Sequence, residues 1–194
     1  MGAKPRYPAT YPTPKSSAPN NAVIARALTA RIEKFREVGI RLDRQGSFWH
    51  QGTQISHPRI TLALLKWLDV RDTDQRPILR FDENRYAYVD VDEAMLLIVS
   101  VHWDDDHPQA ILNDGSREPL AVDALYVGPD SAIYTVARGR RLSARLTPRA
   151  TQSLSGHLDE IAKAGQNQFV IHADGCTYPI GTIDHPRQLL GRFG

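Results

Sequence analysis

Two segments of this 194-residue chain are nearly the same, and this near repeat constrains the architecture more than any other feature of the sequence. Residues 46–59 read GSFWHQGTQISHPR and residues 175–187 read GCTYPIGTIDHPR, so the second copy is one residue shorter. Ahead of each copy stands a helix-like run, then a glycine (Gly39, Gly165), and then a short apolar run typical of a strand. This order predicts two related halves, each with helix and strand.

The composition is that of an ordinary globular protein, with 41% hydrophobic and 24% charged residues. A net charge of +2 does not favour nucleic acid as a partner. A single cysteine, Cys176, excludes an intramolecular disulfide and fits a reducing compartment. The longest apolar run, residues 94–99, is too short to span a bilayer, and no secretory apolar region is evident. We expect a cytoplasmic protein with no membrane insertion; the oligomeric state is not predicted.

The chain divides by composition into three parts. Residues 1–21 contain five prolines and predict a disordered tail, because so little apolar surface does not offset the entropy of ordering it. Residues 22–91 predict an N-terminal α+β domain. Residues 92–194 predict a C-terminal β-rich domain that also contains a helix.

Three helices are predicted. The first runs from Asn20 or Asn21 to Gly39, and the second begins at residues 57–59 with Ser56 as its cap. The apolar face of the second helix includes Leu64, Leu65, Trp67 and Leu68. The third is expected from Thr147 to Gly165, with a buried stripe formed by Leu154, Leu158 and Ile161.

The rest of the chain is rich in strand-like runs separated by short turns. These runs are residues 40–43, 47–51, 77–81, 85–90, 94–104, 109–112, 119–127, 132–137, 140–146, 168–172 and 177–180. The short connections favour antiparallel pairing. The expected fold class is therefore α+β, with mostly antiparallel sheet and packed helices.

The first copy of the repeat resembles a known signature. Residues 39–55, GIRLDRQGSFWHQGTQI, are similar to a motif of a bacterial family known as domain of unknown function 1285. The resemblance implies two duplicated domains, the second like a pleckstrin-homology fold, with a binding cleft at their interface and a regulatory or signalling role. One departure marks a divergent member: residues 91–96 read VDEAML where many members carry an acidic pair followed by Ala-Pro-Phe.

Two groups of arginines are candidates for binding an anion. Arg59 and Arg187 each follow His-Pro at an expected helix start, where backbone N–H groups and the helix dipole attract negative charge. The alternative is that the proline only begins a helix. The densest basic stretch contains Arg138, Arg141 and Arg145. These arginines are candidates to bind an anionic group; the alternative is that they are ordinary charged residues on a solvated sheet face.

Two clusters suggest other chemistry. His102 and Asp104 lie two residues apart on an expected strand and point the same way, so that with His107 they are candidates to hold a metal; the alternative is an acidic strand end. Cys176 follows His172 by four residues, but no orienting third residue accompanies the pair.

Aromatic residues complete the candidate site. Phe48 and Trp49 alternate along a strand, so only one of them is expected in the core, and the other contributes with Trp67 to an interface or a ligand pocket. We predict a binding or regulatory module, without a cofactor, that takes a small anionic ligand or a protein partner. The alternatives are a metal-assisted enzyme and a protein-interaction scaffold. The predicted ligand-binding residues are Trp49, Arg59, Arg138, Arg141 and Arg145.

Overall fold

A computed structural model describes residues 36–163 and 166–190. Residues from Arg36 onward form one compact unit. The predicted tail, and the first predicted helix up to residue 35, lie outside the described residues. In the part of the chain that the structure describes, we find no helix with the length and hydropathy needed to cross a membrane.

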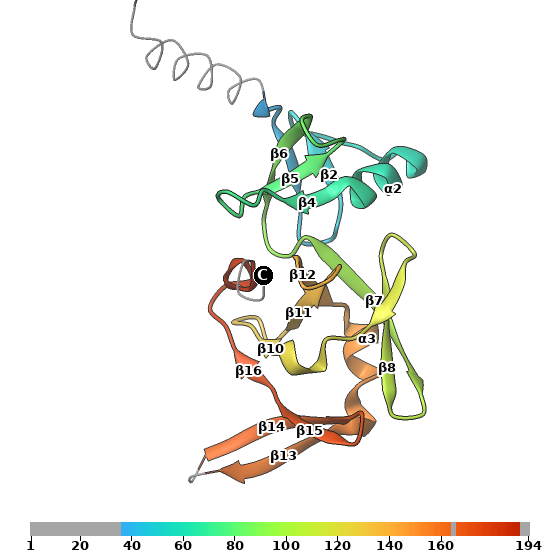
Figure 1. Ribbon diagram of the computed structural model, residues 1–194, viewed down its shortest axis with the longest axis vertical. Coiled ribbons are helices and arrows are strands. Elements are labelled where there is room, and N and C mark those ends of the chain that lie inside the picture. The colour runs from blue at the N-terminus through green and yellow to red at the C-terminus, as the bar shows by residue number, and fades with distance from the viewer. Residues whose placement is uncertain (1–35, 164–165, 191–194) are drawn as a thin grey trace, which may run out of the picture. The chain divides into compact units, whose positions relative to one another are not determined.

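The first sheet has six strands in the order β3-β2-β1-β6-β5-β4 (Figure 1). Its strands are β1 (Ile40–Leu42), β2 (Phe48–His50), β3 (Thr53–Gln54), β4 (Leu68–Val70), β5 (Pro77–Arg80) and β6 (Tyr86–Val91). The β1–β2 hairpin turns at Gly46, whose φ of 79° favours glycine. A Cβ on Gly46 would also lie 3.0 Å from a methyl of Leu97, so the turn needs glycine for two reasons.

Helix α2 (Pro58–Trp67) begins with a proline in its first turn, as predicted. The predicted cap is wrong: His57 is the N-cap residue and no side chain caps the helix. The helix ends at Trp67, whereas the sequence pattern placed Leu68 on its apolar face. Leu68 instead begins β4 and pairs with Leu79 of β5, because alternate residues of β4 are buried against the sheet.

The second sheet has seven strands in the order β16-β10-β11-β12-β7-β8-β9. Its strands are β7 (Leu96–Asp104), β8 (His107–Leu112), β9 (Arg117–Pro119), β10 (Tyr126–Val127), β11 (Ile133–Ala137), β12 (Leu142–Leu146) and β16 (Gly181–Thr182). Pairing is mostly antiparallel, with parallel pairs at β7–β12, β10–β16 and β1–β6. The strand predicted over residues 119–127 is interrupted by the 3₁₀ helix η1 (Val122–Ala124).

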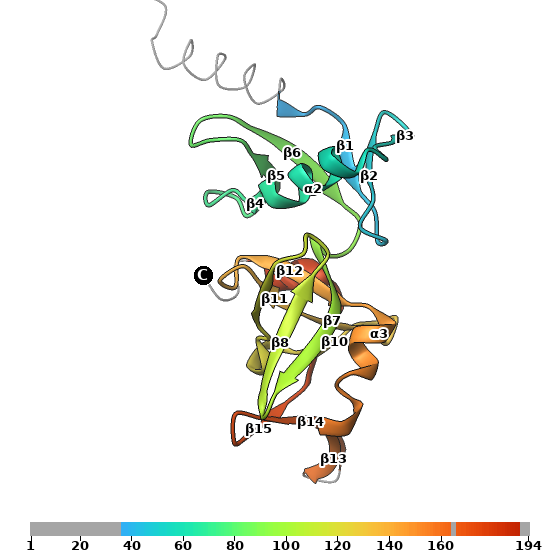
Figure 2. The same ribbon diagram turned by 90° about the vertical axis from the view of Figure 1, so that its right-hand side faces the viewer.

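The third predicted helix is much shorter than expected. Helix α3 (Pro148–Gln152) begins as predicted, with Thr147 accepting a hydrogen bond from the Ala150 N–H, and lies beside β7 (Figure 2). It is followed by η2 (Ser155–His157), which contains Gly156, a residue unfavourable in helices. The next part of the predicted helix, Leu158–Lys163, is strand, and Ile161, expected in the buried stripe, is 40% exposed.

A three-stranded antiparallel sheet contains the rest of that segment. Its strands are β13 (Leu158–Lys163), β14 (Gln166–Ala173) and β15 (Cys176–Pro179), in this order. The chain then continues through β16 to the 3₁₀ helix η3 (Pro186–Leu189). Two helices and many strands in mixed sheets confirm the α+β class in its broad form.

One hydrophobic cluster contains most of the buried side chains. It combines residues of the six-stranded sheet, such as Leu42 and Phe48, with residues of the seven-stranded sheet, such as Leu112 and Leu146. Burial of these side chains removes apolar surface from water, which is the main force that holds the sheets in place.

The two copies of the repeat share a local pattern of strand, strand and proline-initiated helical turn. Their pairing differs. In the first copy, β2 and β3 pair with each other, whereas in the second, β15 pairs with β14 and β16 pairs with β10 of another sheet. Domain duplication, the pleckstrin-homology likeness and the boundary between residues 91 and 92 stay predictions.

Candidate functional site

Trp49 and Arg59 lie on the six-stranded sheet and the first turn of α2. The half-buried Trp49 donates its indole N–H to Asp43 Oδ2 at 2.7 Å, which fixes the ring against the β1–β2 turn. Arg59 is exposed and has no ion pair or hydrogen bond from its side chain to any described residue. The structure does not bring these two residues together with Arg138, Arg141 or Arg145 in one cavity.

The Arg138 side chain, in the turn after β11, contacts the end of helix α2. Its guanidinium donates to the carbonyl oxygens of Leu65 at 2.8 Å and Leu68 at 3.1 Å. It also pairs with Asp114 Oδ2 at 2.7 Å, and the Asp114 side chain is only 4% exposed. A cation at this position gives the carbonyl oxygens at the helix end an additional donor and complements the negative end of the helix dipole.

Arg141, at the end of the same turn, binds the strand that follows α2. It pairs with Asp69 at 3.0 Å and Asp72 at 2.8 Å, and donates to the carbonyl oxygen of Val70 at 3.2 Å. Arg80 of β5 approaches the same Asp69 from within the sheet, at 2.5 Å. The Asp69 carboxylate therefore contacts two guanidinium groups, one from β5 and one from the turn between β11 and β12.

These contacts surround a cavity of about 320 Å³, which we call the basic cavity. It is lined by Lys66, Trp67, Leu68, Asp69, Arg80, Arg138, Arg141 and Leu142. Asp69 is the one carboxylate among these lining residues. Trp67 is 41% exposed and packs edge-on against Phe81, which is 44% exposed.

Lys66 differs from the arginines around it. Each of the three lining arginines has a carboxylate partner. Within the described residues, the Lys66 ammonium has no ion pair or hydrogen bond, and Lys66 is exposed and lines the same cavity as Trp67. The basic cavity therefore presents one uncommitted cation, three arginines fixed in place, and an aromatic wall.

Asp69 is held in its ionised form. Burial raises the pKa of its carboxyl, but hydrogen bonds from Arg80, the Val70 N–H and Arg141 outweigh this and hold its pKa below the ordinary value. A depressed pKa in the folded state means that Asp69 contributes stability above its unfolded pKa of about 3.9, and that this contribution is lost as the pH falls through the folded pKa.

We therefore expect Asp69→Asn to lower the free energy of unfolding by about 1–2 kcal/mol at pH 7, because two charge-assisted hydrogen bonds are weakened. The deficit relative to the natural chain should shrink as the pH falls below about 4, because the carboxyl of the unfolded natural chain takes up a proton there, and it should vanish below the depressed pKa of the folded carboxyl. Urea unfolding at pH 7 and pH 3 measures both. A deficit of the same size at the two pH values would contradict this role.

Arg145 of β12 lies in another cluster, with Glu93 and Asp130. It pairs with Asp130 at 3.2 Å and approaches Glu93 at 3.7 Å. The Tyr134 hydroxyl donates a hydrogen bond to Glu93. Burial is the main cause that raises the Tyr134 pKa, and the neighbouring carboxylates Glu93 and Asp130 raise it further. The buried atoms Glu93 Oε2 and Arg145 Nε have no hydrogen-bond partner among the residues that the structure describes. A neighbouring cavity of about 280 Å³ is lined by four carboxylates and Arg44, so it does not favour an anion.

The predicted metal residues lie around the β7–β8 turn with other partners. Asp104 pairs with Arg117, and His107 pairs with Asp174, which raises the His107 pKa. Across the described ranges, no three His, Cys, Asp or Glu side chains come close enough to hold a metal ion. His172 contacts Asp159 at 2.9 Å and Thr177 at 3.0 Å, and no contact with the exposed Cys176 is found.

Lys66, Asp69 and Arg80 were not among the residues predicted from the sequence. Lys66 and Trp67 together end α2, which is a signal for a cation and an aromatic group at the same helix terminus. Asp69 and Arg80 gave no such signal. They become neighbours only through the pairing of β4 with β5, and β4 was not predicted.

By its fold, the protein is a strand-rich α+β protein with mixed sheets. Its structure is similar to the crystal structure of a DUF1285 family protein from Silicibacter pomeroyi DSS-3, with a TM-score of 0.61 and 18% identity over 76% of this chain and 81% of that chain. A DUF1285 family protein from Shewanella baltica OS155 matches with a TM-score of 0.47 and 17% identity, over 58% of this chain and 87% of the other.

The likeness to the Silicibacter pomeroyi protein confirms, at the level of the fold, the resemblance predicted from residues 39–55. The chain is divergent in sequence, with 18% identity to that protein. No family model matches the sequence, and no curated protein matches it.

Proposed function

We propose that this chain is a divergent DUF1285 relative that acts as a binding or regulatory module, without catalysis of its own, and takes a small anionic ligand in the basic cavity. The observation that carries the proposal is the lining itself, in which Lys66, Arg80, Arg138 and Arg141 stand beside Trp67 with Asp69 as the one lining carboxylate. The predicted duplication, the pleckstrin-homology likeness, a signalling role and a cytoplasmic location belong to this proposal and extend the likeness of fold.

The position of the basic cavity supports the predicted interface site. Lys66, Trp67 and Arg80 precede the predicted boundary at residues 91 and 92, whereas Arg138 and Arg141 follow it. Ion pairs hold these arginines in place before any ligand arrives. A preformed cationic site loses less conformational entropy on binding than one built from free side chains.

The lining also indicates the kind of ligand. A phosphate or carboxylate group is suited to the Lys66 ammonium and the outer N–H groups of the arginines. A planar ring attached to that group would lie against the exposed face of Trp67. A volume of about 320 Å³ is at the lower end of small-molecule sites, which favours a compact ligand such as a mononucleotide or an aromatic acid.

The test is calorimetric titration of the full chain with AMP, inorganic pyrophosphate and benzoate. We expect at least one of them to bind, and Lys66→Ala to weaken that binding about tenfold or more, because a hydrogen bond to a charged group contributes about 1.5–3 kcal/mol. Trp67→Ala should weaken AMP or benzoate but not pyrophosphate, since pyrophosphate has no ring to stack.

Arg59→Ala is the matched control. Arg59 lies on the same helix as Lys66 and is also exposed, but it does not line the basic cavity. Its substitution should leave every affinity unchanged. Loss of binding in Arg59→Ala with full binding in Lys66→Ala would move the site to the first turn of α2 and overturn the proposal, and so would no binding by any of the three anions.

A further inference from the structure

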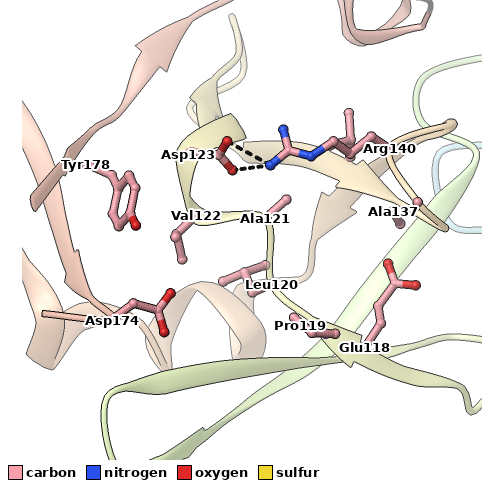
Figure 3. Close-up of a pocket in the computed structure, with 12 residues that line it drawn as sticks. Glu118, Pro119, Leu120, Ala121, Val122, Asp123, Ala137, Arg140, Asp174 and Tyr178 are labelled. Atoms are coloured by element: carbon pink, nitrogen blue, oxygen red, sulfur yellow. Dashed lines mark hydrogen bonds and ion pairs between the residues drawn. The ribbon is translucent and has the colours of Figure 1, made fainter. Parts of the chain in front are cut away.

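A second cavity, with the opposite electrostatic character, lies among β9, η1, the end of β11 and the β14–β15 hairpin. We call it the acidic cavity. Its volume is about 500 Å³, the size of a small-molecule site. Figure 3 shows Asp174 and Tyr178 on one side of it and Glu118 on the other. None of these three residues lines the basic cavity, and of the three only Tyr178 lies within the repeat.

The charged lining consists of three carboxylates and one guanidinium. Asp123 is occupied, because both of its oxygens accept from Arg140 at 2.6 and 2.7 Å. Glu118 uses Oε1 to accept from the Arg138 N–H at 2.8 Å, and Asp174 uses Oδ1 to contact His107. Each of the last two carboxylates thus has a second oxygen, Oε2 or Oδ2, without a hydrogen bond to any residue described.

The rest of the lining is apolar and aromatic. Leu120, Val122, Val136 and Ala137 are buried residues that border the acidic cavity. The half-buried Tyr178 stands above Asp174 on the hairpin side (Figure 3). A tyrosine ring attracts a cation to its face, most strongly where water is partly excluded.

We propose that the acidic cavity binds an organic amine with an aliphatic chain. The ammonium groups lie against Asp174 and Glu118, next to the Tyr178 ring, and the methylene chain packs on Leu120 and Val122. Two carboxylates on opposite sides of an apolar floor match a linear diamine or polyamine, whose charges are separated by methylene groups. A bare metal ion would leave the apolar floor without a partner.

The test uses the full chain and spermidine as the probe, by calorimetry at physiological ionic strength. We expect Asp174→Asn and Glu118→Gln each to raise the dissociation constant about tenfold or more, because each removes one charge partner. Both substitutions preserve the fold. Asparagine tolerates the φ of 54° at position 174, and glutamine keeps an acceptor for the Arg138 N–H.

The matched control is Asp159→Asn. Asp159 is also a carboxylate that contacts a histidine on the three-stranded sheet, but it does not border the acidic cavity. Its substitution should leave the affinity for spermidine unchanged. Lys66→Ala should also leave it unchanged, so this experiment tests the acidic cavity independently of the basic cavity. The proposal would be overturned if spermidine did not bind, or if Asp159→Asn lost as much spermidine affinity as Asp174→Asn. It would also be overturned if Mg²⁺, added at the same total concentration of positive charge, displaced all the bound spermidine.

Discussion

Replacing Arg138 with methionine is expected to lower the free energy of unfolding by about 3 kcal/mol. The substitution removes the cationic partner of Asp114, whose side chain is 4% exposed, and leaves its carboxylate with hydrogen bonds from Ser116 alone among the described residues. It also removes the donor to the carbonyl oxygens of Leu65 and Leu68 at the end of α2. Removal of one partner of a buried pair costs about 3–5 kcal/mol, and we take the lower end because Arg138 itself is 23% exposed.

Urea unfolding followed by circular dichroism measures this effect. Arg85→Met is the control, because it also removes an arginine–aspartate pair, with Asp82 at 2.5 Å, but the Arg85 side chain is 78% exposed. Solvent screens such a pair, so the midpoint should barely change. Equal midpoints for the two variants would show that Arg138 does not hold the end of α2, and the structural role assigned here would be wrong.

Replacing Phe48 with alanine is expected to have the largest effect, a loss of about 3–5 kcal/mol. Phe48 is fully buried and lies in the core cluster, and its carbonyl accepts from the Ile55 N–H at 2.8 Å. Alanine leaves a cavity that the rigid β1–β2 hairpin cannot close. The loss therefore includes both transfer of the ring to water and the cost of the cavity.

Phe169→Ala makes the same chemical change where Phe169 is 55% exposed, on β14. We expect a change within about 0.5 kcal/mol, as for most surface substitutions. Thermal or urea unfolding of both variants compares them directly. A Phe48→Ala protein as stable as Phe169→Ala would contradict the assignment of Phe48 to the core.

Phe48 and Trp49 illustrate what the sequence could predict. Alternation along a strand places adjacent residues on opposite faces, and the structure puts Phe48 in the core and Trp49 half-buried at the turn. Helix starts at Pro58 and Pro148 were predictable for a similar reason, because a proline in a first turn is a local signal.

The errors arose where local patterns were ambiguous. Apolar residues continue from Trp67 into Leu68, so the sequence did not show that α2 ends there and β4 begins. Leu154, Leu158 and Ile161 have helical spacing, yet pairing of β13 with β14 decides the conformation of the last two. Tertiary pairing outweighed local propensity in both places.

The candidate site was only partly predictable. Sequence reasoning selected Arg138 and Arg141 as a basic stretch, and both border the basic cavity. Their partners could not be predicted, since Leu65 and Asp69 are about seventy residues away in the chain. Arg145, from the same stretch, pairs with Asp130 instead and lies outside the basic cavity.

The central claim is that an anionic ligand binds beside Trp67, and the indole N–H resonances of the three tryptophans test it most directly. The indoles of Trp49 and Trp103 are hydrogen-bonded to Asp43 and to the Ser153 carbonyl oxygen, respectively. During titration with AMP, the account predicts a saturable shift of the Trp67 resonance, assigned with Trp67→Phe, while the other two stay in place. A Trp67 resonance that does not move while AMP binds, or that moves equally in Lys66→Ala, would contradict it.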